Sequence, residues 1–317
     1  MGELIDLHAH HLPDSYRAAL VAAGHDQPDG FPVLPTWSAA EHLALMDRLG
    51  IARSMLSISS PGVHLGDGTD PVELAREVND EGHRTTVDHP GRFGLFASLP
   101  LPDVDAAIAE TIRAFDELDV DGVALLTHVD GTYLGDPKLE PLFDELDRQK
   151  ARVFLHPTTP TCGDATSLGR PRPMLEFLFD TTRAVVNMVL NGTIARHPNI
   201  AFVVPHAGAT LPVIADRVAR FVPLVVEAGT QVDVLGDLGR LHYDLAGTPL
   251  PRQLDALLDI TTIEHLHYGS DYPFTPDVAV EALAGALADA GDPPGSLLHA
   301  LAANSRRLLT PRDQPTG

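Results

Sequence analysis

Short runs rich in Val, Ile, Leu and Phe alternate along the chain with longer segments whose apolar residues recur at helical spacing. The short runs are bounded by Gly, Pro or polar residues, which is typical of buried β-strands. They lie at residues 2–8, 53–59, 92–99, 121–127, 151–157, 200–206, 240–247 and 265–271. The pattern therefore predicts eight strands separated by helices.

The amphipathic segments predict the helices between these strands and two more at the end of the chain. They lie at residues 38–50, 71–89, 104–118, 138–149, 174–197, 211–229, 251–260, 277–290 and 295–309. Alternating strands and helices favour a parallel sheet, and eight such units in about 270 residues predict one closed (β/α)₈ barrel, with a doubly wound open sheet as the alternative.

The barrel is expected to form a single domain over residues 1–317, with a frayed tail at 310–317. Two long irregular stretches, 23–37 and 158–173, interrupt the alternation. The second follows the fifth strand directly. We expect it to hang over the barrel mouth as a lid, because the loops of this fold carry function.

Composition narrows the class of partner. The content of 44% hydrophobic and 21% charged residues is that of an ordinary globular protein, and 44 acidic against 22 basic residues leave a net charge of −22. Such a charge repels nucleic acid and anionic membrane surfaces, so we expect a small-molecule substrate.

The N-terminus lacks a signal-peptide pattern and no apolar run is long enough to span a membrane, which favours a cytoplasmic protein. Cys162 is the only cysteine, so a metal would be held by His and carboxylate ligands.

Ionisable side chains occur at the ends of several predicted strands. His8 and His10 are two apart on the first strand and therefore point to the same face. His156, His206 and Asp271 end the fifth, sixth and eighth strands. In a barrel these ends meet at the C-terminal mouth, where imidazoles and a carboxylate suit Zn²⁺, Mn²⁺ or Fe²⁺. A single His at a strand end is usually structural, but burying this whole set without a metal would be costly.

Five segments in this order resemble the metal-dependent amidohydrolase superfamily, within it the branch typified by aminocarboxymuconate-semialdehyde decarboxylase. They are DLHAHHLP at the start, WSAAEHLALMDRLGI before the second strand, FLHPTTP at 154–160, the segment 191–212 that contains VVPHAG, and YGSDYPF at 268–274. The resemblance covers nearly the whole chain.

The resemblance implies that His8, His10, His156 and Asp271 hold one divalent metal, with Zn²⁺ favoured and Mn²⁺ as the alternative. It implies that His206 transfers protons beside the metal, and that the protein is a homodimer. Binuclear members place a carboxylated Lys at the end of the fourth strand. Here that strand reads GVALLTHVD without a Lys, so a mononuclear site is expected.

Substrate contacts are predicted less directly. Arg172 lies in the expected lid and has the geometry to clamp a carboxylate, although a surface Arg in a Pro-rich loop is often only solvated. His42 lies where related decarboxylases carry an Arg. Phe274 and Trp37 can pack on an aromatic ring or fill the core. His128, just past the fourth strand, is expected to be structural or exposed.

The resemblance implies a non-oxidative decarboxylase of a hydroxylated aromatic acid of the salicylate type. The alternative is a hydrolase of a lactone, ester or amide that uses the same metal, with Asp271 or His206 as the base. A barrel that binds ligands without catalysing a reaction is a third interpretation. It is not favoured, because the set of candidate metal and proton-transfer residues is intact: His8, His10, His156, His206 and Asp271.

Overall fold

Eight parallel strands form the centre of the molecule. The computed structural model describes residues 4–66, 68–226, 231–291, 293 and 295–310. Neighbouring strands pair in the order of the chain. The strands are β1 (Leu4–His10), β2 (Ile51–Ser57), β3 (Phe93–Ser98), β4 (Gly122–Leu126), β7 (Arg152–His156), β8 (Ala201–Val204), β9 (His242–Asp244) and β10 (Leu266–His267).

The sheet closes on itself between its first and last strands. The backbone N–H of Leu7 donates to the carbonyl of Tyr268 at 2.9 Å, and Asp6 forms a parallel bridge with the same residue. The (β/α)₈ barrel predicted from the sequence is therefore confirmed, and the doubly wound open sheet is wrong.

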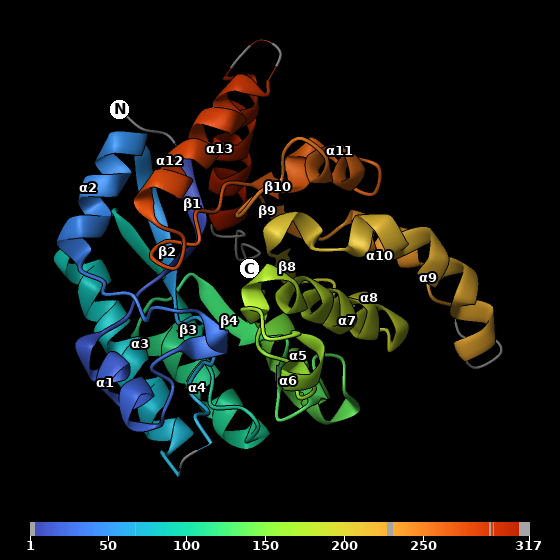
Figure 1. Ribbon diagram of the computed structural model, residues 1–317. Helices are drawn as coiled ribbons and strands as arrows, with labels where there is room; N and C mark the ends of the chain where they lie inside the picture. Colours follow the sequence, from blue (N-terminus) through green and yellow to red (C-terminus); the bar gives the residue numbers. More distant parts are fainter. Residues whose placement is uncertain (1–3, 67, 227–230, 292, 294, 311–317) are drawn as a thin grey trace, which may run out of the picture.

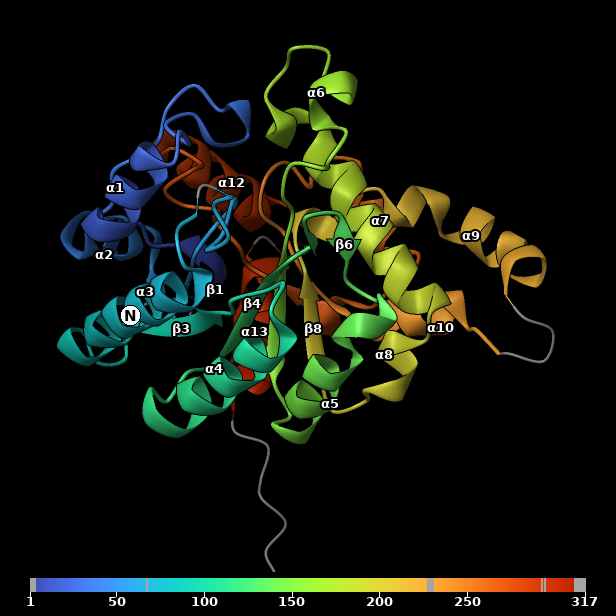
Figure 2. The same cartoon turned by 90° about the horizontal axis from the view of Figure 1, so that it is seen from below.

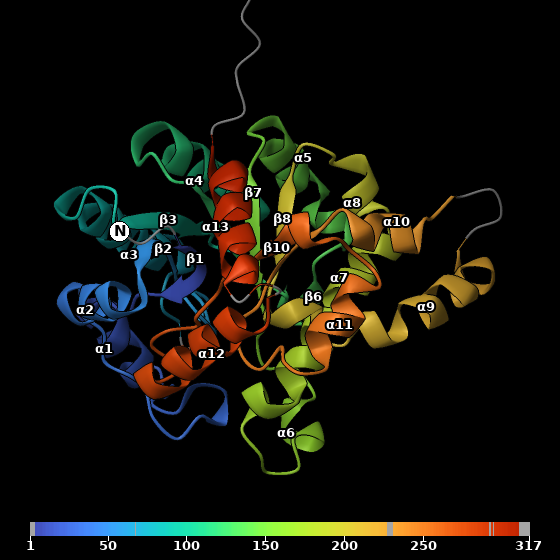
Figure 3. The same cartoon turned by 90° about the horizontal axis from the view of Figure 1, so that it is seen from above.

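Helices surround the strands (Figure 1). The longer ones are α1 (Asp14–Ala22), α2 (Ala39–Leu49), α3 (Pro71–Asp88), α4 (Val104–Glu117), α5 (Glu140–Arg148), α7 (Glu176–Leu190), α9 (Leu211–Val225), α12 (Asp277–Asp289) and α13 (Ser296–Leu309). The shorter ones are α6 (Gly163–Thr166), α8 (Thr193–Arg196), α10 (Val234–Gly239) and α11 (Gln253–Leu258), and β5 (His128–Val129) pairs with β6 (Thr132–Tyr133) in a small hairpin. Figure 3 shows α13 lying against the barrel beside α12.

Local sequence signals fix the helix ends. Ser38 caps α2 by accepting a hydrogen bond from the backbone of Glu41 and by donating to its side chain, and Gly50 ends the helix in the left-handed region at φ 68°. Asp70 caps α3, which begins with Pro71 at its first position. These signals explain why both helices agree closely with the ranges predicted from the sequence.

Two apolar layers stabilise the barrel. Outside the sheet, the strands pack against the surrounding helices in one large buried cluster. Inside it, a second cluster fills the barrel and includes Leu7, Met55, Phe96, Phe154 and Val203. The rings of Phe96 and Phe154 stack at 5.8 Å. This interior packing forms a solid floor beneath the carboxyl ends of the strands.

The two irregular stretches meet at the same end of the barrel. Residues 23–37 contain the 3₁₀ turn η1 (Pro28–Gly30), and residues 158–173 contain α6 and the start of η3 (Arg172–Met174). Asp29 accepts a hydrogen bond from Thr159, and Gly30 lies against the guanidinium of Arg172. Figure 2 shows α6 standing beyond the strands, on the side opposite the C-terminal end of α13.

Among the described residues, no helix is both long and apolar enough to cross a membrane. The frayed tail expected at 310–317 lies outside the described residues, except for Thr310.

Candidate active site

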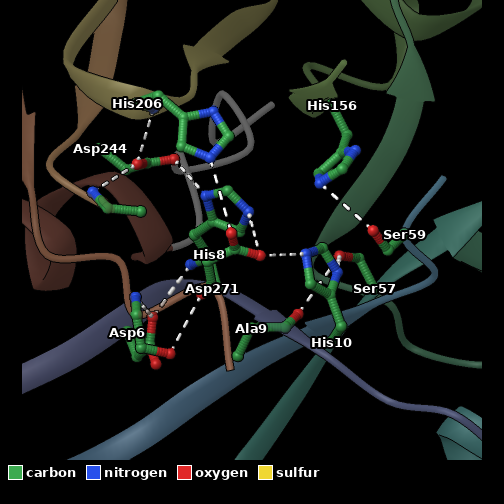
Figure 4. A network of polar contacts seen from close by, with 12 residues as sticks. Asp6, His8, Ala9, His10, Ser57, Ser59, His156, His206, Asp244 and Asp271 are labelled. Carbon is green, nitrogen blue, oxygen red and sulfur yellow. Dashed lines mark hydrogen bonds and ion pairs between the residues drawn. The ribbon is translucent and has the colours of Figure 1, made fainter. Parts of the chain in front are cut away.

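Four side chains that were predicted as metal ligands converge at the barrel mouth (Figure 4). His8 and His10 come from β1, His156 ends β7, and Asp271 lies in the loop after β10. One ligand atom from each lies within 4.8 Å of the others. The three imidazoles are buried, and Asp271 is partly exposed. Divalent transition metals prefer such a set of nitrogen and oxygen donors, which we call the metal cage.

Partners on Nδ1 orient the two histidines of β1. His8 Nδ1 lies 2.9 Å from a carboxylate oxygen of Asp244 and must donate to it. His10 Nδ1 lies 3.0 Å from Ser57 Oγ, and that hydroxyl is positioned to donate to the carbonyl of Ala9. Nδ1 of each ring is therefore protonated, and each buried Nε2 points into the cage as the atom that would bind a metal.

His156 is oriented in the same way. Its Nδ1 lies 2.7 Å from the carbonyl of Pro157, an atom that can only accept. The lone pair therefore lies on Nε2, which faces Ser59 Oγ at 3.4 Å and is the atom that would bind a metal. Burial, together with the nearby His10 and His8, holds the pKa of His156 well below its ordinary value, so the ring stays neutral as a ligand must.

The electrostatics of the cage favour a cation at its centre. Burial alone would raise the pKa of Asp271, but the charge of His8 and the hydrogen bonds of the surrounding His10, His206 and His8 together outweigh it, so the pKa lies well below its ordinary value. Burial alone would lower the pKa of His8, yet the carboxylates of Asp244 and Asp271 raise it to about 10. The carboxylates thus attract one positive charge to the space between the rings. A divalent ion fits this site because it supplies that charge and binds the lone pairs directly.

Asp271 does not end the eighth strand, and the prediction that it does is wrong. The strand β10 ends at His267, and Asp271 lies beyond it at φ 58°. Gly269 lets the chain pass close to its neighbours here, since a Cβ atom would come within 2.8 Å of His8 and 3.1 Å of Asp244. Backbone N–H groups of Ser270 and Asp271 then donate to the carbonyl of His8 and hold the loop on β1.

His206 lies beside the cage on a strained turn. It follows β8 by two residues, rather than ending it, at φ 55°. Asp244 accepts from its backbone N–H, and the Gln253 side chain donates to its carbonyl at 2.6 Å, which holds the unusual conformation. Nε2 lies 3.7 Å from Asp271, and the buried Nδ1 has no hydrogen-bond partner among the described residues. The ring is therefore placed to exchange a proton with a ligand at the cage.

A cavity of about 200 Å³ opens onto these residues. His156, His206 and Asp271 lie on one part of its wall, and much of the remainder is aromatic or aliphatic, including Phe31, Phe177, Phe274 and Leu178. Phe274 contacts the ring of His10 edge-on at 5.6 Å. The cavity thus combines a metal cage with flat apolar walls that suit a small aromatic ring.

The other predicted substrate contacts lie elsewhere. Arg172 lines a neighbouring cavity of about 570 Å³ and pairs with Asp164. His42 is buried and accepts a hydrogen bond from the Trp37 indole at 3.1 Å, and neither residue lines the cavity beside the metal cage. His128 donates to the carbonyl of Thr159 and accepts from the backbone of Gly131, a fully satisfied structural arrangement.

Three important site residues were missed by sequence reasoning. Asp244 ends β9 in the motif HYDLAG and touches both His8 and His206, and Ser57 ends β2. Their positions at strand ends were a usable signal, because such residues face the mouth of this fold. The third, Asp29, belongs to an irregular stretch with no periodic pattern.

The family model described as amidohydrolase matches residues 5–310. The chain belongs to the amidohydrolase family. It is 35% identical over 289 residues to a decarboxylase of Aspergillus niger, covering 86% of this chain and 77% of that protein. It is 32% identical over 321 residues to a 6-methylsalicylic acid decarboxylase of Aspergillus aculeatus, covering 96% of this chain and 95% of the relative.

A crystal structure described as amidohydrolase II is similar to this amidohydrolase over its full length. The two share 36% sequence identity with a TM-score of 0.91, and the match covers 97% of this chain and 100% of the other. The resemblance inferred from the five sequence segments is therefore confirmed at the level of family and fold.

Proposed function

We propose that this amidohydrolase is a metal-dependent decarboxylase that removes CO₂ from a small hydroxylated aromatic acid without oxidation. The observation that carries the proposal is the metal cage of His8, His10, His156 and Asp271 opening into an aromatic-walled cavity. The similarity of this protein to decarboxylases over most of the chain supports the same reaction. Salicylates of the 6-methylsalicylate type are the proposed substrates.

The ligands would hold one divalent ion, which we propose to be Zn²⁺, with Mn²⁺ as the alternative because both accept this donor set. When bound, the ion would supply positive charge for the carboxylate and the adjacent phenolate oxygen of the substrate. Strand β4 offers no Lys that would bridge a second ion.

The residues of the chain account for the remaining chemistry. Phe274 and Phe177 bind the faces or edges of the ring, and the apolar wall excludes water from it. His206 holds a proton near the ring and delivers it to the carbon that bears the carboxylate. The carbon–carbon bond then breaks, its electron pair restores the aromatic ring, and CO₂ leaves.

Decarboxylation in D₂O tests this proposal. We expect 6-methylsalicylate to yield CO₂ and 3-methylphenol that carries deuterium at the carbon that lost the carboxylate. No CO₂ from salicylate, 6-methylsalicylate or any dihydroxybenzoate would contradict the proposal. Turnover of a lactone or ester without CO₂ would instead favour the hydrolase.

We further propose that the protein is a cytoplasmic homodimer. Exposed apolar side chains on α9 support association, because Phe221, Leu224 and Val225 are 47%, 77% and 61% exposed on a helix that projects from the barrel (Figures 1 and 2). Sedimentation of the wild-type protein and of Leu224→Glu tests the dimer, which should dissociate in the variant. A monomeric wild-type protein at micromolar concentration would contradict it. Fractionation of the source cells tests the location.

A further inference from the structure

The cavity beside the metal cage has one ionisable wall residue that belongs neither to the cage nor to the proton-transfer site. This residue is Asp29, which also lines the neighbouring cavity of about 570 Å³. Its carboxyl group therefore lies at the boundary between the two spaces. The part of the wall formed by Phe31, Phe177 and Phe274 offers no charge that would offset it.

The local structure directs the Asp29 side chain to this boundary. Its backbone adopts the left-handed conformation, at φ 56° and ψ 22°, which Asp and Asn tolerate better than most residues. The hydroxyl of Thr159 donates to Oδ1 at 2.5 Å and links the two irregular stretches. Because the backbone and this hydrogen bond together fix the side chain, it presents a defined acceptor to a ligand.

The cation that acts on Asp29, Arg172, does not neutralise this carboxyl by a direct ion pair. Arg172 acts on Asp29 through its charge, but its guanidinium forms its ion pair with Asp164. The buried Nε of Arg172 has no hydrogen-bond partner among the described residues. Burial raises the pKa of Asp29, which reflects the cost of keeping this charge beside apolar walls.

We propose that Asp29 is a specificity-determining residue that accepts a hydrogen bond from a donor substituent on the substrate ring and excludes substrates with a second anionic group at that position. The proposal deepens the proposed function and rests on it. A half-buried carboxylate such as that of Asp29 gains a strong hydrogen bond from a hydroxyl group but repels a carboxylate in the same place. Asp29 would also orient the substrate, because the hydrogen bond to the ring substituent turns the reacting carboxylate towards the metal cage.

The variant Asp29→Asn tests this role with little disturbance. Asn retains the size, the tolerance of the left-handed conformation and an oxygen that accepts from Thr159, but it removes the charge. The ligands are salicylate, its analogues with a second hydroxyl at each remaining ring position, and the corresponding analogues with a second carboxylate. Dissociation constants for the metal-loaded protein come from calorimetry, and kcat/KM from CO₂ release.

In the wild-type protein we expect one ring position at which a hydroxyl tightens binding and a carboxylate weakens it. Asp29→Asn should reduce the preference for hydroxyl over carboxylate at that position by about tenfold or more. Asp26→Asn, at an exposed position of the same stretch, is the matched control and should keep the wild-type preference. Thr159→Val should weaken the hydroxyl preference yet still exclude the carboxylate, because the charge remains.

Equal preferences in the wild-type protein and in Asp29→Asn at every ring position would overturn the inference. If Asp29→Asn does not fold, an unchanged hydroxyl preference in Thr159→Val would overturn it as well. Failure of the proposed function is distinguishable, because it appears as absence of CO₂ with every ligand, whereas the dissociation constants still measure the selectivity of Asp29.

Discussion

At the scale of single residues, the site depends on the groups that hold the ligands as much as on the ligands themselves. The spacing of His8 and His10 and the strand-end positions of the other ligands could be read from the sequence, because period two and barrel geometry dictate where they point. The partners Asp244 and Ser57 could not be paired with their histidines in this way. Their contacts join residues that are far apart in the chain and depend on the register between strands.

Replacing Asp244 with Asn should weaken the binding of the metal. The amide group of Asn would face the Nδ1–H of His8 and favour the other tautomer, which places the proton on the ligand nitrogen. We expect the affinity for Zn²⁺ to fall by about 10- to 100-fold, measured by competition with a chelator. Asp255→Asn on the exposed side of α11 is the control. Unchanged affinity in Asp244→Asn would show that Asp244 does not orient His8.

Replacing His206 with Asn should separate proton transfer from metal binding. We expect kcat to fall by about 100- to 10,000-fold, because general acid catalysis contributes on this order. The metal content should remain that of the wild-type protein, since His206 is not a ligand in the proposed cage. Elemental analysis alongside CO₂ release measures both quantities. A variant that loses its metal would place His206 among the ligands instead.

At the scale of elements, apolar periodicity located all eight strands and most helices, but not the ends of every strand. The last two strands are shorter than predicted, because their polar carboxyl ends turn away from the sheet to line the mouth. The six-residue α10 was not predicted, since a segment this short has no clear periodic face. The candidate contacts His42 and Trp37 instead pack α2 onto its neighbours, with the ring of His42 lying 5.2 Å from Phe93 and 4.8 Å from Tyr272.

The buried His42 should make the protein less stable in acid. Burial lowers its pKa from 6.5 to about 3, so the folded protein keeps the ring neutral while the unfolded chain takes up a proton below pH 6.5. The unfolded state then binds more protons, and the free energy of unfolding falls as the pH falls from 6.5 towards 3. In His42→Gln this decline should be shallower by about 1.4 kcal/mol per pH unit in that range.

Urea unfolding at several pH values, followed by the fluorescence of Trp37, measures this difference. The exposed His299, replaced by Gln, is the control and should leave the slope unchanged. An identical pH dependence in wild-type protein and His42→Gln would mean that the ring is protonated in the folded state.

At the scale of the whole molecule, closure of the barrel brings together residues from both ends of the chain. His8 near the start and Asp271 near the end meet only because β10 returns to β1. The architecture was predictable, since eight strand–helix units leave few alternatives. The shape of the cavity was not, because it depends on where two irregular stretches meet over the mouth.

A metal ion in this cage should stabilise the entire fold. The ligands come from β1, β7 and the loop after β10, so the ion would bind the folded chain far better than the unfolded one. We expect chelation to lower Tm, and added Zn²⁺ or Mn²⁺ to restore it in a concentration-dependent way. His8→Ala should have a reduced Tm that chelator no longer changes. A Tm of the wild-type protein that is insensitive to chelation would argue against a structural contribution from the metal.

We propose that one metal ion, held by His8, His10, His156 and Asp271, is required for decarboxylation of an aromatic acid. Measuring the CO₂ released from 6-methylsalicylate together with the metal content of the same samples tests this requirement. We predict turnover by wild-type protein with one bound ion per chain, its loss on chelation, its return with added metal, and neither metal nor turnover in His8→Ala. CO₂ release that persists in metal-free wild-type protein, or its absence from fully loaded protein across salicylate substrates, would contradict the account.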